Sequence, residues 1–338
     1  MRILALQLKR IGDLVLTTPA LALLRRTFPE AYLALAVNEG CAPLLGAIGD
    51  VDTSAVFGRG RGFAPWQQMM TGPWDLCLDF TGTDRSALAS VLSRAKQRAT
   101  FEWVRKNRFQ ALAYHRFIDS SVRERHTVDH YLDLVNGVLP QAKQPAETGP
   151  RLILPETAIR GAAESLEQSG IREPFVLLHP GTARPEKFWQ AERWAEVART
   201  LFDRWGLRSI LTGGNAPPET THCAQISSAG VPGLVDFSGK LDLLALAALV
   251  SRARLVISCD TAIVHLAAAF RRPQVALFGP TNPFHWRPRH PHTVILSAAS
   301  PAEALTDFSS RMKGAPMERI STDLVISATN TLLAASAS

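Results

Sequence analysis

Cysteine is scarce in this sequence, and long apolar runs are absent from it. The four cysteines are scattered without the paired spacing of a zinc site, so we interpret them as free thiols (Cys41, Cys77, Cys223 and Cys259). No uninterrupted apolar run reaches the roughly 18–20 residues that a membrane-spanning helix needs. The run from Ile3 to Leu8 is too short for the apolar region of a signal peptide. We therefore expect a cytoplasmic protein.

Two short functional motifs are missing as well. A nucleotide-sugar epimerase or a dehydrogenase of the doubly wound type needs a GxGxxG turn after its first strand, and residues 9–13 (KRIGD) do not supply one. The segments that we expect to form the pocket, all in the second half of the chain, have no DxD motif and no cluster of His and Asp at the spacing of metal ligands. We therefore expect no metal and no cofactor.

The charge of the chain is distributed unevenly. The protein has 338 residues, 46% of them hydrophobic and 20% charged, which is ordinary for a soluble protein and is long enough for two domains. Much of the net charge of +7 comes from one stretch, residues 94–125, where nine basic residues face three acidic ones. Such a stretch suits nucleic acid, an anionic membrane surface or an anionic substrate. No nucleic-acid motif accompanies it, so we favour the last two, and a solvated surface stays the alternative.

The first half of the chain alternates short apolar runs with stretches of helical periodicity. The apolar runs bounded by turn residues predict buried strands at residues 2–8, 32–37, 51–57 and 74–79. The periodic stretches predict helices at residues 13–26, 85–92 and 127–138. Pro19 lies inside the first of these helices and predicts a kink or an early first turn there.

The same alternation starts again after a proline-rich stretch. Residues 140–150 contain three prolines, one glycine and no apolar periodicity, which is typical of a linker. Beyond it, strands are expected at residues 175–179, 209–212, 255–257 and 274–278. Helices are expected at residues 191–205, 241–252, 262–270 and 321–333. Two such series predict an α/β fold with two doubly wound, Rossmann-like domains that face a cleft, at residues 1–145 and 151–320.

Four segments of the second half place phosphate-binding chemistry at the expected carboxyl ends of strands. These segments are residues 179–189, 213–219, 239–241 and 260–265. The carboxyl ends of parallel strands meet at one edge of a sheet, and helix N-termini there favour phosphate. Together the segments indicate a pocket for a nucleoside diphosphate. Taken singly, each segment also has a purely structural interpretation. In the last segment, for example, Asp260 would only cap a helix and His265 would lie against the core.

Individual side chains suggest roles in that pocket. Thr182 offers a hydroxyl and a backbone donor, and Lys187 offers a mobile positive charge. Glu219 lies just beyond a glycine turn, where a carboxylate suits two ribose hydroxyls, and the turn at Leu241 suits the edge of an adenine. The alternative for Lys187 is a surface lysine without a role, and the alternative for the glycine segments is a turn without a ligand.

Asp13 is the one conspicuous acidic group of the first half. It lies where the first predicted strand turns into the first predicted helix, so in a two-domain cleft it faces the other half. A carboxylate there is well placed to take a proton from an attacking hydroxyl. The alternative is an N-cap aspartate without a chemical role.

Several ordered motifs resemble one family of transferases over nearly the whole chain. LQLKRIGDLVLTTPALALLRRTFP at residues 6–29 is similar to the family's N-terminal motif. HPGTARPEKFWQAERWAEVA, GGNAPPE and the stretch from residue 238 to residue 283 are similar to its C-terminal motifs. The family is that of the ADP-heptose:lipopolysaccharide heptosyltransferases, glycosyltransferase family 9, with the GT-B fold. LDFTGTDRSALASVLSRAK and HTVDHYLDL resemble the heptosyltransferase III-like branch.

The resemblance implies a role for each matching residue, with inverting transfer and without a metal. Asp13 would be the catalytic base. The donor would be bound by Thr182 and Lys187 at the diphosphate, Glu219 at the ribose, the Leu241 backbone at the adenine, and Asp260, Thr261, Ala262 and His265 around sugar and phosphate. The chain departs from the family pattern at Ala183 and at Ala262, where a small hydroxyl residue and a glycine are usual. In the GT-B fold the last helix, here residues 321–338, crosses back to the first domain.

We therefore expect an enzyme that moves a heptose from ADP-heptose to the inner core of lipopolysaccharide, at the cytoplasmic face of the inner membrane. The charge distribution assigns the acceptor to the first domain, with Arg10 beside Asp13 as the leading contact and with Arg105, Lys106 and Arg108 at the membrane and the rim of the cleft. The alternatives are another nucleotide sugar and glycan acceptor, or a binding protein without catalytic activity.

Overall fold

The chain divides into two compact units at Ile153 and Leu154. The computed structural model describes residues 1–59, 62–142 and 149–335. The division lies a few residues beyond the predicted linker at residues 140–150, of which residues 143–148 lie outside the described part of the chain.

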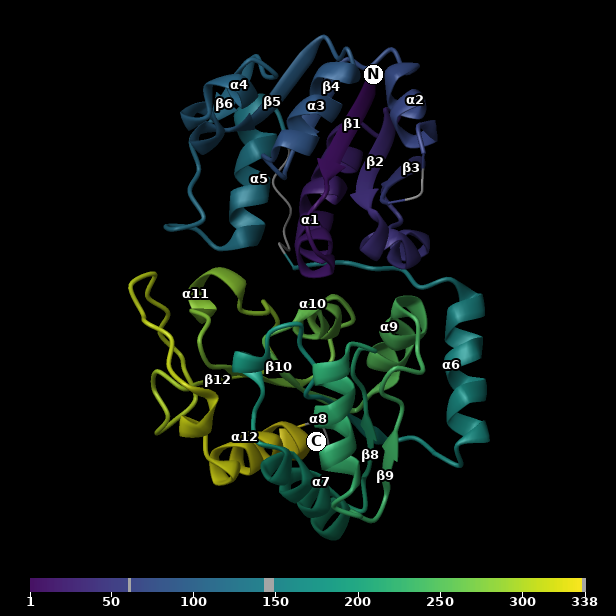
Figure 1. Cartoon of the computed structure of the whole chain (residues 1–338), viewed down its shortest axis with the longest axis vertical. Coiled ribbons are helices and arrows are strands. Elements are labelled where there is room, and N and C mark those ends of the chain that lie inside the picture. The colour runs from purple at the N-terminus through teal and green to yellow at the C-terminus, as the bar shows by residue number, and fades with distance from the viewer. Residues whose placement is uncertain (60–61, 143–148, 336–338) are drawn as a thin grey trace. The chain divides into compact units, whose positions relative to one another are not determined.

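The first unit is built on a parallel sheet of six strands in the order β3-β2-β1-β4-β5-β6 (Figure 1). The strands are β1 (Arg2–Gln7), β2 (Tyr32–Asn38), β3 (Thr53–Phe57), β4 (Leu76–Asp79), β5 (Gln97–Phe101) and β6 (Arg116–Ile118). The helices are α1 (Ile11–Thr27), α2 (Ala64–Met70), α3 (Asp84–Leu92), α4 (Arg108–Ala111) and α5 (Thr127–Val138), with 3-10 turns η1 (Glu39–Ala47) and η2 (Glu102–Lys106). Helix α1 packs with α5, and α2 packs with α3.

Pro19 is accommodated inside α1 rather than ending it. Proline has no N–H, so the carbonyl of Val15, four residues earlier, loses its helical donor. The hydroxyl of Thr18 donates to that carbonyl at 2.7 Å. The hydroxyl of Thr17 donates in the same way to the carbonyl of Asp13 at 2.7 Å and accepts a hydrogen bond from Gln7 Nε2 at 2.7 Å. These polar side chains join the first turns of α1 to the end of β1.

The second unit repeats the architecture, with the sheet order β12-β11-β10-β7-β8-β9 (Figure 1). Its strands are β7 (Phe175–His179), β8 (Arg208–Leu211), β9 (Leu234–Asp236), β10 (Leu255–Cys259), β11 (Gln274–Phe278) and β12 (Thr293–Ser297). Its helices are α6 (Glu156–Gln168), α7 (Ala191–Trp205), α8 (Pro217–Ser227), α9 (Leu243–Arg252), α10 (Ala262–Ala269), α11 (Pro283–Trp286) and α12 (Thr322–Ala335), with 3-10 turns η3 (Pro185–Lys187) and η4 (Met317–Arg319).

Both sheets have the order of the Rossmann fold. In each unit the first strand lies near the centre of the sheet. The second strand of that unit lies on one side of it and the fourth strand on the other. Ligands of such sheets bind at this point, where the strand order reverses, beyond the carboxyl ends of the strands. The sequence therefore predicted the fold class correctly, although it missed strands β5, β6, β9 and β12. The cleft between the domains stays a prediction.

The last helix, which the sequence predicts to cross to the first domain, packs within its own unit, and its contact with the first domain stays a prediction. Helix α12 packs against α7, β11 and β12 of its own unit, and Val325, Ala328 and Leu332 lie in that unit's apolar core. The indole Nε1 of Trp205 also donates to Oδ1 of Asn330 at 2.9 Å. The apolar side that the sequence offered for the first domain is thus used within the second unit.

Candidate active site

The sheet order brings the four predicted segments of the second unit to neighbouring strands. Residues 180–187 follow β7, residues 212–219 follow β8, residues 237–241 follow β9, and residues 260–265 follow β10. In the sheet these strands stand in the order β10-β7-β8-β9, although β10 is the last of the four in the chain. The segments therefore share one edge, and the reversal of strand order lies between β7 and β10.

Lys187 and Asp260 form a largely buried ion pair at this reversal. Lys187 Nζ lies 2.6 Å from Asp260 Oδ2 and donates to the Asp260 carbonyl at 3.2 Å. The two side chains are only 12% and 9% exposed. Lys187 is the last residue of the 3-10 turn η3, which begins at Pro185. The structure thus fixes a positive charge where phosphate is expected, and a buried carboxylate holds it there.

The cap of α10 is Thr261 rather than Asp260. Thr261 Oγ1 accepts a hydrogen bond from the Ile263 N–H at 3.2 Å, whereas the Asp260 carboxylate is engaged by Lys187. Ala262 is the first residue of the helix, and His265, one turn later, is buried. The prediction that Asp260 caps α10 is therefore wrong, because its carboxylate pairs with Lys187 and the Thr261 hydroxyl accepts from the first turn instead.

Glu219 joins two of the glycine turns. It lies in the first turn of α8, and its Oε2 accepts a hydrogen bond from the Gly214 N–H at 2.8 Å. A Cβ atom added at Gly181 would clash with the same Oε2 and would lie 3.0 Å from the Gly213 Cα atom. Only glycine allows these segments to approach so closely. The carboxylate is therefore held at the strand edge where a ribose is expected.

His179 is the last residue of β7 and Thr182 lies three residues later, and both are buried. Thr182 Oγ1 accepts a hydrogen bond from the Arg184 N–H at 3.3 Å. The ring Nδ1 of His179 lies 2.9 Å from Thr212 Oγ1, and burial lowers the pKa of His179 to about 4. The imidazole is therefore neutral near pH 7. Sequence reasoning gave His179 no role, although it opens the first phosphate-binding segment.

Leu241 lies between two turns that the structure ties to the same edge. The Gly239 N–H donates to the Gly213 carbonyl at 3.0 Å, and Gly239 has a φ of +68°, which favours glycine. Asp242 caps α9 by accepting from the Ala245 N–H at 2.7 Å. Gly239, two residues before Leu241, is thus joined to Gly213, and the role of the Leu241 backbone in base binding stays a prediction.

Asp13 is buried in the first unit, near the carboxyl end of β1. It is the third residue of α1, whose N-cap is Arg10, so Asp13 is not the N-cap. Its Oδ1 accepts a hydrogen bond of 2.7 Å from the phenol of Tyr131 on α5. Burial, and then the Asp13 charge, raise the pKa of Tyr131 well above its usual value, so the phenol keeps its proton and donates. Tyr131 lies in the HTVDHYLDL motif, but sequence reasoning gave it no role.

The basic residues assigned to the acceptor lie in two parts of the first unit. Arg10 is exposed and begins α1. Arg105, Lys106 and Arg108 are exposed on η2 and α4, between β5 and β6. Arg105 forms an exposed ion pair of 3.0 Å with Glu102. The structure thus separates Arg10, which is close in sequence to Asp13, from the other three.

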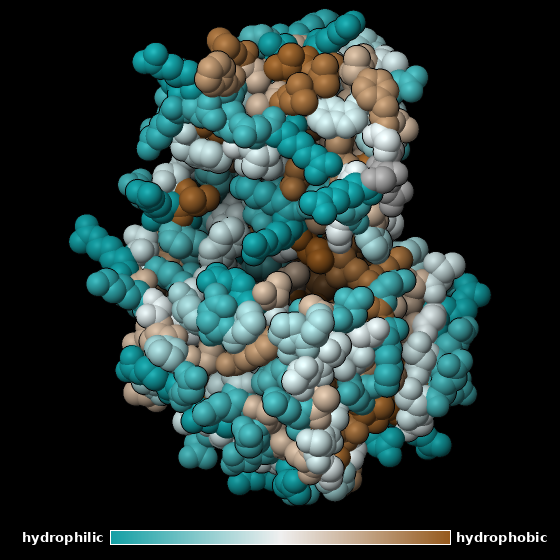
Figure 2. All heavy atoms as spheres, in the orientation of Figure 1, coloured by the Kyte–Doolittle hydropathy of each residue, from teal (hydrophilic) through white to brown (hydrophobic). Residues whose placement is uncertain are grey.

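Apolar side chains are exposed among these three basic residues. Phe109 is 88% exposed and Leu112 is 81% exposed, and both lie in or directly after α4. Figure 2 shows hydrophilic and apolar side chains next to each other on the visible face of the first unit. Isolated exposed apolar residues are common, but here two nearly bare ones lie beside three cations.

In residues 1–59, 62–142 and 149–335 there is no group of three or more His, Cys, Asp or Glu side chains that could hold a metal ion. Within the same ranges, the helices are too short or too polar to cross a membrane.

The family model and the related sequences that match this chain are both of heptosyltransferases. The family model of glycosyltransferase family 9 (heptosyltransferase) matches residues 63–315. Lipopolysaccharide heptosyltransferase 3 of Escherichia coli is 23% identical over 292 residues, which are 82% of this chain and 83% of that protein.

Solved structures resemble the chain over its full length. A glycosyl transferase family 9 protein from Veillonella parvula has a TM-score of 0.84 at 24% identity, covering 99% of this chain and 97% of that one. The ADP-heptose lps heptosyltransferase II of E. coli has a TM-score of 0.81 at 19% identity, and the match covers 100% of this chain and 100% of that one. At these identities the likeness shows the fold, which is GT-B.

Proposed function

Since this chain belongs to glycosyltransferase family 9, the heptosyltransferase family, and is therefore a glycosyltransferase, we propose that it transfers a heptose from ADP-heptose to the anionic inner core of lipopolysaccharide. We propose further that transfer inverts the anomeric centre and needs no metal. The observation that carries the donor assignment is the ion pair of Lys187 and Asp260 at the strand-order reversal of the second unit.

The second unit supports the binding of a nucleoside diphosphate by fixed charges. Lys187 Nζ would donate to a phosphate oxygen, and the backbone N–H groups at the start of α10, from Thr261 and Ala262, would meet the same group. Asp260 keeps Lys187 in place before the donor arrives, which reduces the entropy lost on binding. Positive charge held close to the diphosphate stabilises it as a leaving group, the work that a metal performs in other transferases.

The remaining donor contacts follow the order of the strands. Glu219 Oε2 is held by the Gly214 N–H, and we assign its Oε1 to a ribose hydroxyl. The Leu241 backbone is assigned to the adenine, and Thr182 to the diphosphate. His265, buried one turn into α10, is assigned to the end of the pocket where sugar and phosphate meet.

The first unit supports a general base at Asp13. In the proposed step the acceptor hydroxyl gives its proton to Asp13 while its oxygen attacks the anomeric carbon, and the bond from that carbon to the diphosphate oxygen breaks. Attack opposite the leaving group inverts the anomeric centre. The hydrogen bond from Tyr131 orients one carboxylate oxygen, so that the other is directed to the acceptor.

A panel of nucleotide sugars tests the proposed function directly. Release of nucleoside diphosphate would be measured with ADP-, GDP- and UDP-sugars, with a heptose-deficient lipopolysaccharide core as acceptor. We expect ADP-heptose to support turnover above the rest of the panel, and a product with inverted anomeric configuration. Turnover with a GDP- or UDP-sugar alone would contradict the donor assignment. Tight ADP binding without turnover on any acceptor would favour a binding protein.

Metal independence is a separate prediction. We expect turnover to survive EDTA, because Lys187 and the start of α10 supply the positive charge at the diphosphate. The assay would follow ADP release after gel filtration into EDTA buffer, and again after addition of Mg²⁺, Mn²⁺ or Fe²⁺. Loss of turnover with EDTA and recovery with any one of these ions would show the charge argument to be wrong.

The exposed basic surface of η2 and α4 predicts a dependence on salt. We expect the combined change of Arg105, Lys106 and Arg108 to Ser to raise the apparent KM for a lipid-anchored acceptor severalfold, with donor binding unchanged. Charges this exposed act through a field that is screened beyond about 8 Å at physiological ionic strength, so added salt should mimic the variant. An unchanged acceptor KM at every ionic strength, or weaker donor binding, would contradict this role.

Phe109 and Leu112 distinguish a membrane contact from an acceptor contact. We propose that this surface meets the cytoplasmic face of the inner membrane. The Phe109→Ser, Leu112→Ser double variant should lose sedimentation with anionic vesicles, yet keep its KM for a water-soluble, delipidated acceptor. If the KM for that soluble acceptor rises instead, the two side chains contact the sugar and not the lipid.

A further inference from the structure

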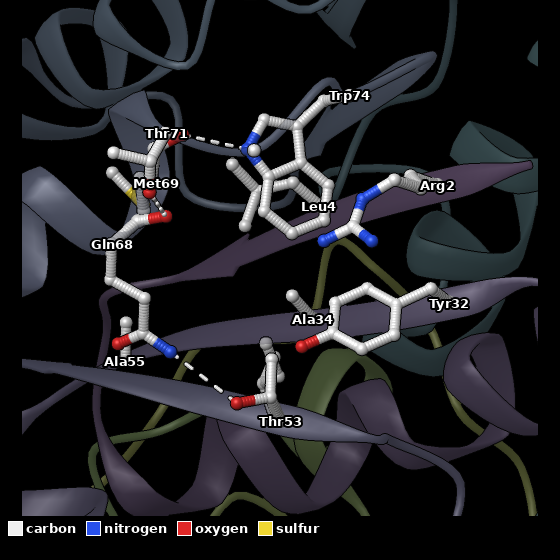
Figure 3. Close-up of a pocket in the computed structure, with 12 residues that line it drawn as sticks. Arg2, Leu4, Tyr32, Ala34, Thr53, Ala55, Gln68, Met69, Thr71 and Trp74 are labelled. Atoms are coloured by element: carbon white, nitrogen blue, oxygen red, sulfur yellow. Dashed lines mark hydrogen bonds between the residues drawn. The ribbon is translucent and has the colours of Figure 1, made fainter.

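A cavity of about 200 Å³ lies in the first unit, away from the proposed catalytic residues (Figure 3). Its floor is one face of the sheet, formed by Leu4 of β1, Ala34 of β2 and Ala55 of β3. Helix α2 and the segment after it close it with Gln68 and Trp74, among others. The small alanines leave space that larger side chains would fill. None of the residues assigned to donor, acceptor or catalysis lines it.

The cavity lies at the opposite end of the strands from Asp13. Arg2, Tyr32 and Thr53, which line it, are the first residues of β1, β2 and β3. Asp13 follows the last residue of β1, and six strand residues span about 20 Å. A ligand here would not compete with an acceptor at Asp13.

Arg2 brings a positive charge to the cavity. Its Cζ atom lies 4.1 Å from the Tyr32 ring centroid and 5.2 Å from that of Trp74, and the two rings are stacked at 6.1 Å. Figure 3 shows the terminal guanidinium nitrogens between these rings, directed into the cavity. The buried Nε of Arg2 has no hydrogen-bond partner among the residues that the structure describes. A buried donor without an acceptor is costly, so an acceptor from a ligand would stabilise it.

The nearby carboxylate of Asp75 does not serve this guanidinium. Asp75 Oδ2 accepts a hydrogen bond from the Arg2 backbone N–H at 2.8 Å, and Asp75 Oδ1 accepts one from Lys96 Nζ at 2.7 Å. These two contacts direct the carboxylate to the backbone and to a surface lysine. The side chain of Arg2 instead lies against the rings of Tyr32 and Trp74, and its terminal nitrogens point into the cavity (Figure 3), where a ligand could accept from them.

We propose that this cavity binds a small monocarboxylate with an apolar body. The carboxylate would accept hydrogen bonds from Arg2, whose fork matches two carboxylate oxygens. The apolar body would pack on Leu4, Ala34 and Trp74, and Gln68 and Thr53, joined at 3.3 Å, would border it. Arg2 is the single charged side chain among the twelve that line the cavity, so one negative charge is matched and a phosphate dianion is not.

Calorimetric titration of the full-length protein tests the proposal. The probes are hexanoate and benzoate, their uncharged amides, and inorganic phosphate. We expect saturable binding of a carboxylate, binding of its amide at least about tenfold weaker because charged hydrogen bonds are lost, and no binding of phosphate. Carboxylate binding should also change tryptophan fluorescence, and Trp74→Phe should remove that change. Equal binding of acid and amide, or no binding of either acid, would overturn the proposal.

Variants locate the site. Arg2→Gln should weaken carboxylate binding by about tenfold to a hundredfold. Ala55→Leu keeps Arg2 and fills the cavity, and should abolish binding in a protein that circular dichroism shows to be folded. The matched control is Arg85→Gln, because Arg85 also lies over an aromatic ring, 5.6 Å from that of Phe57, but outside the cavity. Unchanged affinity in both Arg2→Gln and Ala55→Leu would place the ligand elsewhere and overturn the assignment.

Discussion

Replacing Asp13 by Asn should lower turnover by about 10² to 10⁴ and leave the affinity for the nucleotide sugar unchanged. The amide is nearly the same size as the carboxylate and can still accept the hydrogen bond from Tyr131, so the local fold should persist. The amide cannot take a proton from the acceptor hydroxyl, so the chemical step alone should suffer. Donor affinity would be measured by calorimetry with ADP, and turnover by release of ADP in the presence of acceptor.

Two further variants separate the base from its surroundings. Tyr131→Phe keeps the carboxylate and removes its hydrogen bond, and we expect a loss of only about tenfold. Asp323→Asn removes an exposed carboxylate from the first turn of α12 and should leave turnover unchanged. Near-normal turnover of Asp13→Asn, or a fall in donor affinity equal to the fall in turnover, would show that Asp13 is not the base.

Replacing Lys187 by Met should weaken ADP binding by about tenfold to a hundredfold or more. The variant loses a charge-assisted hydrogen bond to the phosphate, and it leaves the buried Asp260 carboxylate without its cation beside the diphosphate. The second effect adds repulsion to the loss of attraction. Binding would be measured by titration with ADP at constant ionic strength.

The double variant Lys187→Met, Asp260→Asn isolates the two effects. Removing the carboxylate as well should recover part of the lost ADP affinity, because the repulsion disappears while the missing cation is not restored. The matched control is Lys96→Met, which breaks a Lys–Asp pair of similar length, 2.7 Å, that is exposed in the first unit. If Lys187→Met binds ADP as tightly as Lys96→Met does, the diphosphate is held by other groups.

The strongest local patterns of the sequence predicted the elements that carry the site. Short buried runs rich in β-branched residues, such as Leu255–Cys259, favour a strand, and the turn residues after them mark where strands end. Asp13 and Lys187 were recognised because their motifs sit at such turns. The short strands β6 and β9, each of three residues, have too few residues for a periodic signal and were missed.

The sequence by itself determined two α/β units, their Rossmann-like type and the segments that could bind phosphate, because these follow from periodicity and turn chemistry within a few residues. The tertiary structure decided which segments meet. It placed β10 beside β7, brought Asp260 to Lys187 across 73 residues and Tyr131 to Asp13 across 118. It also packed α12 on its own unit. Such partners are selected by burial and by hydrogen-bond satisfaction summed over the whole core, and no local pattern records that sum.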